Sequence, residues 1–270
     1  MKLSICQMVS GEDPSANLRE LRRLTVEAAA DGADLAVFPE FAMLGVSALT
    51  PEVIARAEPL DGPFVSGLVE VSRETGVRIV AGVLEEIPGE KRAYNTLVYV
   101  TPQEGLAQQY RKTHLYDAFG FKESDNICAG PLDGPAMFDI GEIRVGMLTC
   151  YDLRFPEPAR QHADAGVSVL VYPAAWVPGP RKEDHWSTLA RARAIENTMY
   201  VAAVSQGPAL GTGGSLIVDP MGLVLSELGE RSGVATSEIR AERIAEVRAS
   251  NPSLANRRFS VVPVASSRSL

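Results

Sequence analysis

The sequence predicts an α/β fold with mixed β-sheets, and two features of its pattern support this. Residues 14–38 and 63–83 each read as an amphipathic helix that leads directly into a short apolar strand. Residues 94–112 and 137–149 instead contain β-rich runs separated by short turns, which suits hairpins better than helical crossovers. Because helix–strand units give parallel pairs and hairpins give antiparallel pairs, both kinds of pairing are expected.

The first two helices have clear start and stop signals. Asp13 and Pro14 begin the first helix, since proline suits the first turn. Its apolar face and its end are marked by Leu18, Leu21, Leu24, Ala28 and Gly32. The second helix runs from Pro63 to Gly76 in the same way, and each helix is followed at once by a strand.

The second half of the chain continues the pattern. The elements expected after Cys150 are a short helix, a strand at 167–173, a long helix at about 183–199, a strand at 200–205 and a hairpin at 215–225. Residues 162–173 resemble residues 30–39, because each is a helix end followed by a buried strand that ends in an aromatic residue and proline. Two similar halves fit two facing sheets with helices outside, in one domain over 1–270 that no linker divides.

Composition limits the partners that the protein can have. The chain has 270 residues, 46% of them hydrophobic, which is enough for a substantial core. Its net charge of −8 argues against nucleic acid or an acidic membrane surface, since both would repel it. No apolar stretch approaches the roughly 20 residues of a membrane span, and no signal peptide follows Met1. We therefore expect a cytoplasmic protein that acts on a small molecule.

The chain has three cysteines, Cys6, Cys128 and Cys150, which lie far apart in the sequence. An odd and dispersed set does not suggest a disulfide framework or the close ligand pairs of a metal site. All three thiols are expected to be free, and neither a metal nor another cofactor is expected.

Residues 145–157 are the most informative stretch, because an apolar run ends abruptly at Cys150 and then turns polar. This is typical of a strand that delivers a nucleophile to a sharp turn into a helix, with the next N–H, that of Tyr151, free to face an oxyanion. Two other strand-like segments end in an ionisable residue, Glu40 in one and Lys112 in the other. Together the three segments offer a thiol, a carboxylate and an ammonium group.

Each of these residues also has an ordinary structural interpretation. A cysteine thiol has a pKa of about 8.5, so a nucleophilic one needs a base or positive neighbours, which Glu40 and Lys112 can supply. Taken singly, a buried cysteine is usually inert, and Glu40 and Lys112 suit a solvated loop and a basic sheet edge. His114 is interpreted as packing beside the site, and His162 and His185 are assigned no chemistry.

Three motifs together resemble the nitrilase superfamily of carbon–nitrogen hydrolases, in the order that this family has them. They are Phe-Pro-Glu-Phe around Glu40, Tyr-Arg-Lys-Thr-His-Leu around Lys112, and Leu-Thr-Cys-Tyr-Asp-Leu-Arg-Phe-Pro-Glu around Cys150. Similarity later in the sequence extends the resemblance over nearly the whole chain. The resemblance implies a four-layer α-β-β-α sandwich with two mixed sheets and a catalytic Cys-Glu-Lys triad.

The resemblance also implies a role for each residue. Glu40 would take the thiol proton as Cys150 attacks an amide carbonyl, and would return it to the departing amine. Lys112 and the Tyr151 N–H would hold the developing oxyanion. Many relatives carry a second glutamate after the lysine motif, and Glu123 matches that position, where it would bond Lys112 and orient the substrate or water. The alternative interpretation of Glu123 is a solvated loop acid.

The residues after the nucleophile are similar to those of the amidase branches, nearest to the ω-amidase and deaminated-glutathione-amidase group. Arg154 lies where carbamoylase relatives have an arginine that binds the substrate carboxylate, a task that suits a planar guanidinium. The alternative for Arg154 is a structural ion pair with Glu157 or Asp152. Tyr151 and Trp176 complete the expected substrate-binding set.

Two further features concern the substrate. Arg181 or Lys182, in the loop after Trp176, can add local positive charge for an anionic substrate. Gly214 stands where many relatives of this group carry histidine in a Gly-His-Ser sequence, and this departure bears on the substrate more than on the reaction.

The favoured function is hydrolysis of a small, carboxylate-bearing amide through a cysteine thioester, with release of ammonia. The alternatives are an N-carbamoyl amino acid amidohydrolase, which also releases carbon dioxide, and a catalytically idle homologue that acts as a binding or assembly module. A homodimer or larger assembly is expected, because the resemblance implies pairing that extends the sandwich and because the tail, about 250–270, has an apolar stretch at 257–264.

Overall fold

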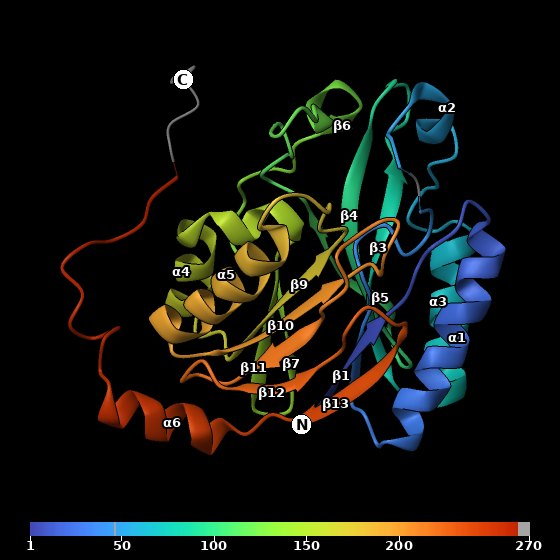
Figure 1. Ribbon diagram of the computed structural model, residues 1–270. Coiled ribbons are helices and arrows are strands. Elements are labelled where there is room, and N and C mark those ends of the chain that lie inside the picture. Colours follow the sequence, from blue (N-terminus) through green and yellow to red (C-terminus); the bar gives the residue numbers. More distant parts are fainter. Residues whose placement is uncertain (46, 264–270) are drawn as a thin grey trace.

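The computed structural model describes residues 1–45 and 47–263. Two mixed sheets face each other and helices cover both outer surfaces, as Figure 1 shows. The predicted four-layer α-β-β-α sandwich is therefore confirmed.

The first sheet has the strand order β13-β1-β2-β3-β4-β5, with β6 paired to β4. β1, β2 and β3 run parallel, whereas the β3–β4 and β4–β5 pairs are antiparallel. The strands are β1 Lys2–Gln7, β2 Leu35–Val37, β3 Arg78–Glu86, β4 Ala93–Thr101, β5 Gly105–Arg111, β6 Ile127–Cys128 and β13 Gly233–Glu238.

The second sheet has the order β12-β11-β10-β9-β8-β7. Its central strands β8, β9 and β10 are parallel, and β7, β11 and β12 join by antiparallel pairing. The strands are β7 Met137–Ile140, β8 Ile143–Met147, β9 Val169–Ala174, β10 Tyr200–Ser205, β11 Leu216–Val218 and β12 Val224–Glu227.

Helices α1 and α3 lie on the outside of the first sheet, and α4 and α5 lie on the outside of the second (Figure 1). The α-helices are α1 Pro14–Ala30, α2 Pro51–Ile54, α3 Pro63–Thr75, α4 Pro156–Asp164, α5 Lys182–Asn197 and α6 Ala241–Ser250. Two 3₁₀ helices, η1 Glu123–Asp125 and η2 Cys150–Arg154, interrupt the loops that carry candidate site residues.

The central strands β2, β9 and β10 are buried on both faces, as expected where sheets are covered by helices. In β2, Leu35 and Val37 belong to the apolar cluster shared with the second sheet, whereas Ala36 packs with the residues of α1 and α3. This alternation follows from the two-residue period of a strand. The sandwich therefore has an inner apolar layer between the sheets and an outer layer under each helix pair.

Most predicted elements are confirmed, including α1, α3, the β4–β5 and β7–β8 hairpins, α5 and the strand Tyr200–Ser205. β2 and β9, the two strands with similar sequences, each lie between parallel neighbours in their own sheet. The last strand and helix, β13 and α6, were not predicted. β13 is only partly buried along its length and lacks a continuous apolar run, so pairing with β1 decides its conformation.

The carboxyl ends of the parallel strands lie at one edge of the sandwich, and the loops that leave them build the candidate site. Gly82 in β3 is essential to one of these loops. A Cβ at Gly82 would lie 2.6 Å from the Glu40 Cα and 2.6 Å from the Phe41 nitrogen. Only glycine lets β3 pass this close to the backbone that carries Glu40.

The predicted oligomer tail, about 250–270, is described as far as residue 263, and residues 264–270 lie outside the described part of the chain. Within the described part, Phe259 is 90% exposed and Val262 is 74% exposed, and Arg257 is paired with Asp164. No helix within residues 1–45 and 47–263 is long and apolar enough to cross a membrane.

Gly82→Ala is expected to lower the free energy of unfolding by about 1–3 kcal/mol, because the added methyl group meets backbone atoms that cannot rotate away. Urea denaturation measures this. Gly229→Ala is the matched control, since a Cβ there meets nothing within 4 Å, and its effect should stay within about 0.5 kcal/mol. Equal midpoints for the two variants would show that the close approach does not constrain the fold.

Candidate active site

Four ionisable side chains predicted from the sequence meet at the carboxyl edge of the sandwich. Glu40 follows β2, Lys112 directly follows β5, Glu123 opens η1 and Cys150 opens η2. All four are buried, with exposed fractions of 1%, 2%, 7% and 7% respectively. The interpretation of Glu123 as a solvated loop acid is therefore wrong.

Lys112 lies at the centre of this group. Its Nζ donates to the Glu40 Oε1 at 2.9 Å and to the Glu123 Oε2 at 2.9 Å. Burial by itself favours the neutral amine, but the charges of Glu123 and Glu40 outweigh it and raise the pKa of Lys112 well above its usual value. The ammonium group is therefore charged at neutral pH and holds the two carboxylates on either side of it.

Glu40 is fixed through both of its carboxylate oxygens. Oε1 also accepts from the Asn95 Nδ2 at 2.7 Å, and Oε2 accepts from the Ala175 N–H at 2.7 Å. The Asn95 Nδ2 donates in addition to the Glu123 Oε1 at 3.0 Å. Sequence reasoning missed Asn95, although a side-chain amide within the largely apolar strand β4 is a signal that could have identified it.

Cys150 has a left-handed backbone conformation, with φ of 44°, at the start of η2. Such a conformation is unfavourable for a residue with a side chain and occurs at nucleophile turns. The Tyr151 N–H lies in the first turn of this 3₁₀ helix, where backbone donors have no partner within the helix. The predicted sharp turn after an apolar strand is thus present.

The Cys150 thiol is protonated at neutral pH. Its burial and then the negative charge of Glu40 raise its pKa well above the usual value, and the charge of Lys112 only partly opposes them. The sequence left open whether a base or positive neighbours would activate this thiol. The raised pKa speaks against activation by positive neighbours alone, and Glu40 is the carboxylate with the largest effect on this thiol.

Asp152 joins the lysine motif to the cysteine turn, a role that the sequence did not indicate. Its Oδ2 accepts from the Thr149 N–H at 2.9 Å and from the Tyr110 hydroxyl at 2.7 Å. Its Oδ1 lies 2.7 Å from the His114 Nδ1 and accepts from the His114 N–H at 3.1 Å. His114 also stacks on Phe155 at 4.0 Å, so its predicted structural position beside the site is confirmed.

The predicted substrate-binding residues lie beside this cluster. The Arg154 guanidinium lies 4.8 Å from the centre of the Trp176 ring and 5.4 Å from that of Phe119. Tyr151 meets Tyr116 edge-on at 5.1 Å. Since the Asp152 oxygens are occupied and Arg154 has no ion pair within the described ranges, the structural-pair interpretation of Arg154 is not supported.

The two further cations differ sharply in environment. Arg181 is exposed and lies 3.7 Å from Asp184, whereas Lys182 is buried and donates to the Tyr116 hydroxyl at 3.0 Å. Gly214 has φ of 64°, and its carbonyl accepts from the Trp186 Nε1 at 2.9 Å. A histidine at position 214 would therefore require a left-handed backbone in this structure.

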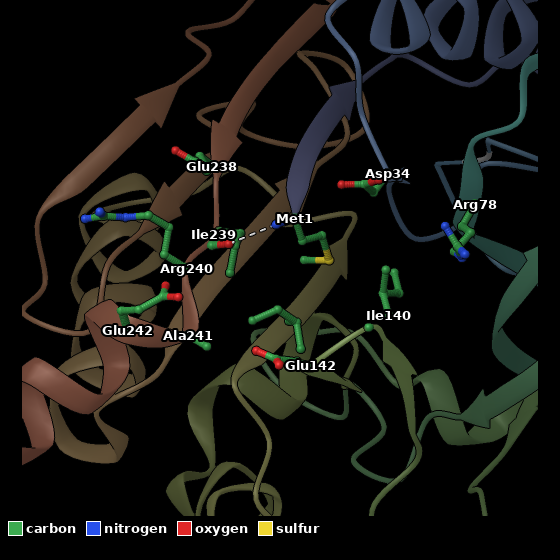
Figure 2. A pocket seen from close by; sticks show the side chains of 12 residues that line it. Met1, Asp34, Arg78, Ile140, Glu142, Glu238, Ile239, Arg240, Ala241 and Glu242 are labelled. Atoms are coloured by element: carbon green, nitrogen blue, oxygen red, sulfur yellow. Dashed lines mark hydrogen bonds between the residues drawn. The ribbon is translucent and has the colours of Figure 1, made fainter.

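An open cavity of about 740 Å³ lies at the opposite end of the parallel strands, as Figure 2 shows. Met1, Asp34 and Arg78 line it, and they stand at or just before the amino ends of β1, β2 and β3. Ligands of α/β sheets usually bind outside the carboxyl ends instead. Its lining, as far as the described residues show it, includes none of the predicted site residues.

No group of three or more His, Cys, Asp or Glu side chains in the described part of the chain is arranged to hold a metal ion. In the cluster around Cys150, the space between the two glutamates is occupied by the Lys112 ammonium group.

Comparison with known proteins identifies the family. The model of the family described as carbon-nitrogen hydrolase matches residues 2–249. A deaminated glutathione amidase of Escherichia coli O157:H7 is 38% identical over 238 residues, which cover 87% of this chain and 89% of that protein. An omega-amidase of Xenopus laevis is 34% identical over 270 residues, which cover 95% of each protein.

The fold is also similar to that of a solved amidase mutant from Nesterenkonia sp. AN1, with a TM-score of 0.79 and 26% identity over 93% of this chain and 97% of that chain. That structure shows the result of Michael addition of acrylamide at its active-site cysteine. The match of the family model over most of the chain, together with these relatives and the three motifs at one site, leads to one conclusion: this chain belongs to the carbon–nitrogen hydrolase family.

Proposed function

We propose that this protein is an amidase that cleaves a small, carboxylate-bearing amide through a thioester on Cys150 and releases ammonia. One observation carries the proposal: a buried lysine held between two carboxylates adjoins a cysteine on a strained turn. The amidases among the relatives, one of them with a modified active-site cysteine, support the reaction class.

In the first half of the reaction, the Cys150 sulfur attacks the amide carbonyl carbon as Glu40 takes the thiol proton. The negative charge that develops on the carbonyl oxygen is stabilised by the Lys112 ammonium and the Tyr151 N–H. When the carbon–nitrogen bond breaks, Glu40 returns the proton to the departing nitrogen. Ammonia leaves, and the acyl group remains as a thioester on Cys150.

In the second half, Glu40 takes a proton from a water molecule, whose oxygen attacks the thioester carbon. The oxyanion returns to the same donors, and collapse breaks the carbon–sulfur bond. The proton on Glu40 passes to the Cys150 sulfur, so the free carboxylic product and the original thiol are restored. Glu40 accepts and returns one proton in each half of this reaction, so it must be held in place. The hydrogen bonds from Asn95 and from the Ala175 N–H hold it.

Glu123 acts in this proposal by holding Lys112. Its Oε2 accepts from the Lys112 Nζ and, at 2.6 Å, from the Tyr116 N–H, while Oε1 accepts from Asn95. With these bonds in place, Glu123 keeps the ammonium charged and aimed, and it positions the loop that begins at Tyr116. Glu123 therefore orients the substrate or water indirectly, through Lys112, Tyr116 and Asn95.

Arg154 is proposed to bind the carboxylate at the far end of the substrate. Its guanidinium has no ion pair within the described residues, and its Nε is buried without a hydrogen-bond partner there. Trp176 lies under the guanidinium, and the Ala175 N–H next to it bonds Glu40, so this end of the site adjoins the base. An N-carbamoyl amino acid would present the same carboxylate, and carbon dioxide among the products would identify that alternative.

We further propose that the protein forms a homodimer or larger assembly. Nucleic acid is not proposed as a partner, because the net negative charge of the protein would repel it. Ile195, Met221 and Leu223 are 44%, 54% and 62% exposed and form an apolar patch. The patch lies where the end of α5, which contains Ile195, meets the turn between β11 and β12, which contains Gly222. A Cβ on Gly222 would lie only 2.6 Å from the Ile195 side chain. A cytoplasmic location and a single domain over 1–270 stay predictions.

Glu40→Gln and Lys112→Gln are each expected to lower kcat by at least about a hundredfold, because a general base and an oxyanion donor are each typically worth this much. Ammonia release from a screen of ω-amides, N-carbamoyl amino acids and nitriles measures turnover. Circular dichroism serves as the folding control. Near-wild-type turnover in either folded variant would remove that residue from the mechanism, and no turnover of any compound by wild type would favour the idle homologue.

Arg154→Lys is expected to raise KM for carboxylate-bearing amides, because it keeps the charge but loses the planar fork that pairs with a carboxylate. Uncharged amides of the same length should be much less affected. Steady-state kinetics on matched charged and uncharged amides separate these effects. Equal losses on both substrates would show that Arg154 supports the scaffold instead.

Leu223→Asp is expected to shift the protein to a smaller assembly, because a charge placed within the apolar patch disfavours its burial. Light scattering at micromolar concentration gives the mass. Val26→Asp, at an α1 position that is 55% exposed on the other side of the sandwich, is the matched control. A monomeric wild type would refute the assembly, and an unchanged mass for Leu223→Asp would exclude this patch as the interface.

A further inference from the structure

We infer that Lys182 and Arg154 together form an anion site, in which Lys182 is a second, specificity-determining contact to the carboxylate of the substrate. The inference rests on the proposed function and adds a residue to it. Its starting point is the placement of Lys182, which is only 4% exposed, beside the cysteine site.

Lys182 and Arg154 lie over the same two aromatic rings. The Lys182 Nζ is 5.1 Å from the centre of the Trp176 ring and 4.4 Å from that of Phe119. The Arg154 guanidinium lies 4.8 Å and 5.4 Å from those rings. Two cations are thus held close together, although like charges at short range repel each other.

No carboxylate compensates these two charges within the part of the chain that the structure describes. The Lys182 Nζ bonds the Tyr116 hydroxyl, and Arg154 has a contact of 3.4 Å with the ring of His185. Glu183 and Asp184, the acids that follow Lys182, are exposed. Aromatic faces attract cations, but they replace only part of the hydration that a buried ammonium loses.

The backbone adds a further cost. Lys182 is the first residue of α5, and the amino end of a helix disfavours a positive charge. Burial and the charge of Arg154 accordingly lower the pKa of Lys182. The lysine is nevertheless fixed here, because its carbonyl accepts from the Trp176 Nε1 at 2.8 Å. An anion bound beside Lys182 would offset its repulsion from Arg154, the desolvation of its ammonium group and the unfavourable effect of the α5 amino end.

The position suits a substrate carboxylate. Tyr116 links the two parts of the site, since its hydroxyl bonds Lys182 while its N–H bonds Glu123. Trp176 makes the same connection on the other side, because its ring lies under both cations and the preceding Ala175 N–H bonds Glu40. The ligand is therefore an aliphatic amide with a carboxylate at its far end, such as the monoamide of a short dicarboxylic acid.

Binding of glutarate to the Cys150→Ala protein, measured by isothermal titration calorimetry, tests the site without turnover. Lys182→Met is expected to weaken glutarate binding at least tenfold, and Lys182→Arg should retain more of it, since the charge remains. Arg181→Gln is the matched control at the neighbouring exposed cation and should bind as the parent does. Glutarate binding by Lys182→Met within twofold of the parent would overturn the inference.

Kinetics in the protein with Cys150 intact separate specificity from structure. Lys182→Met should raise KM for glutaramate at least tenfold, and the loss in kcat/KM should be several times larger for glutaramate than for the uncharged butyramide. Equal losses on both amides would show a structural role and refute the inference. If wild type cleaves neither amide but binds glutarate through Lys182, the proposed reaction fails while the anion site stands.

Discussion

The buried ammonium of Lys112 is the interaction on which the rest of the site depends. Two ionised carboxylates are costly to bury close together without a compensating charge, because the desolvation and the repulsion are both large. Lys112 supplies that charge at 2.9 Å from each of them. Lys112 thus lies between the Glu40 and Glu123 carboxylates and holds both beside the Cys150 turn.

The site lies where the two sheets meet, and hydrogen bonds between the sheets hold its residues in place. Glu40 comes from the first sheet, yet its Oε2 is held by the Ala175 N–H at the end of β9 in the second. Its backbone carbonyl accepts from the Gln206 Nε2 at 3.0 Å, just beyond β10. Asp152, after β8, bonds Tyr110 in β5. Packing of one sheet on the other therefore assembles the geometry of the site, and within the first sheet Gly82 lets β3 approach the backbone of Glu40.

Charge is distributed unevenly across the site, and this suggests how it would select a substrate. The cluster around Cys150 has its carboxylates paired with Lys112, whereas Arg154 and Lys182 have no carboxylate partner in the described residues. A protein with a net charge of −8 gives no long-range attraction to an anion, so such a substrate must be held by local cations. In the proposed function, a short amide has its reacting end at Cys150 and its charged end at the two cations.

The α/β class, most strands and helices, and the candidate residues Glu40, Lys112 and Cys150 could all be predicted from the sequence. These follow from local signals, namely apolar periodicity, helix caps and polar residues at the exits of apolar strands. The similarity of the two halves indicated two facing sheets, and the resemblance to a family added the four-layer sandwich and Glu123.

How those residues are held, and which other residues join them, could be seen only in the folded chain. Asn95 and Asp152 gain their roles from partners far away in the chain, and Lys182 differs from Arg181 only because one is buried against aromatic rings and the other faces solvent. The strand β13 likewise forms through pairing with β1 across the length of the chain. Hydrogen bonds and burial between distant segments depend on the packing of the two sheets, which no local pattern of residues encodes.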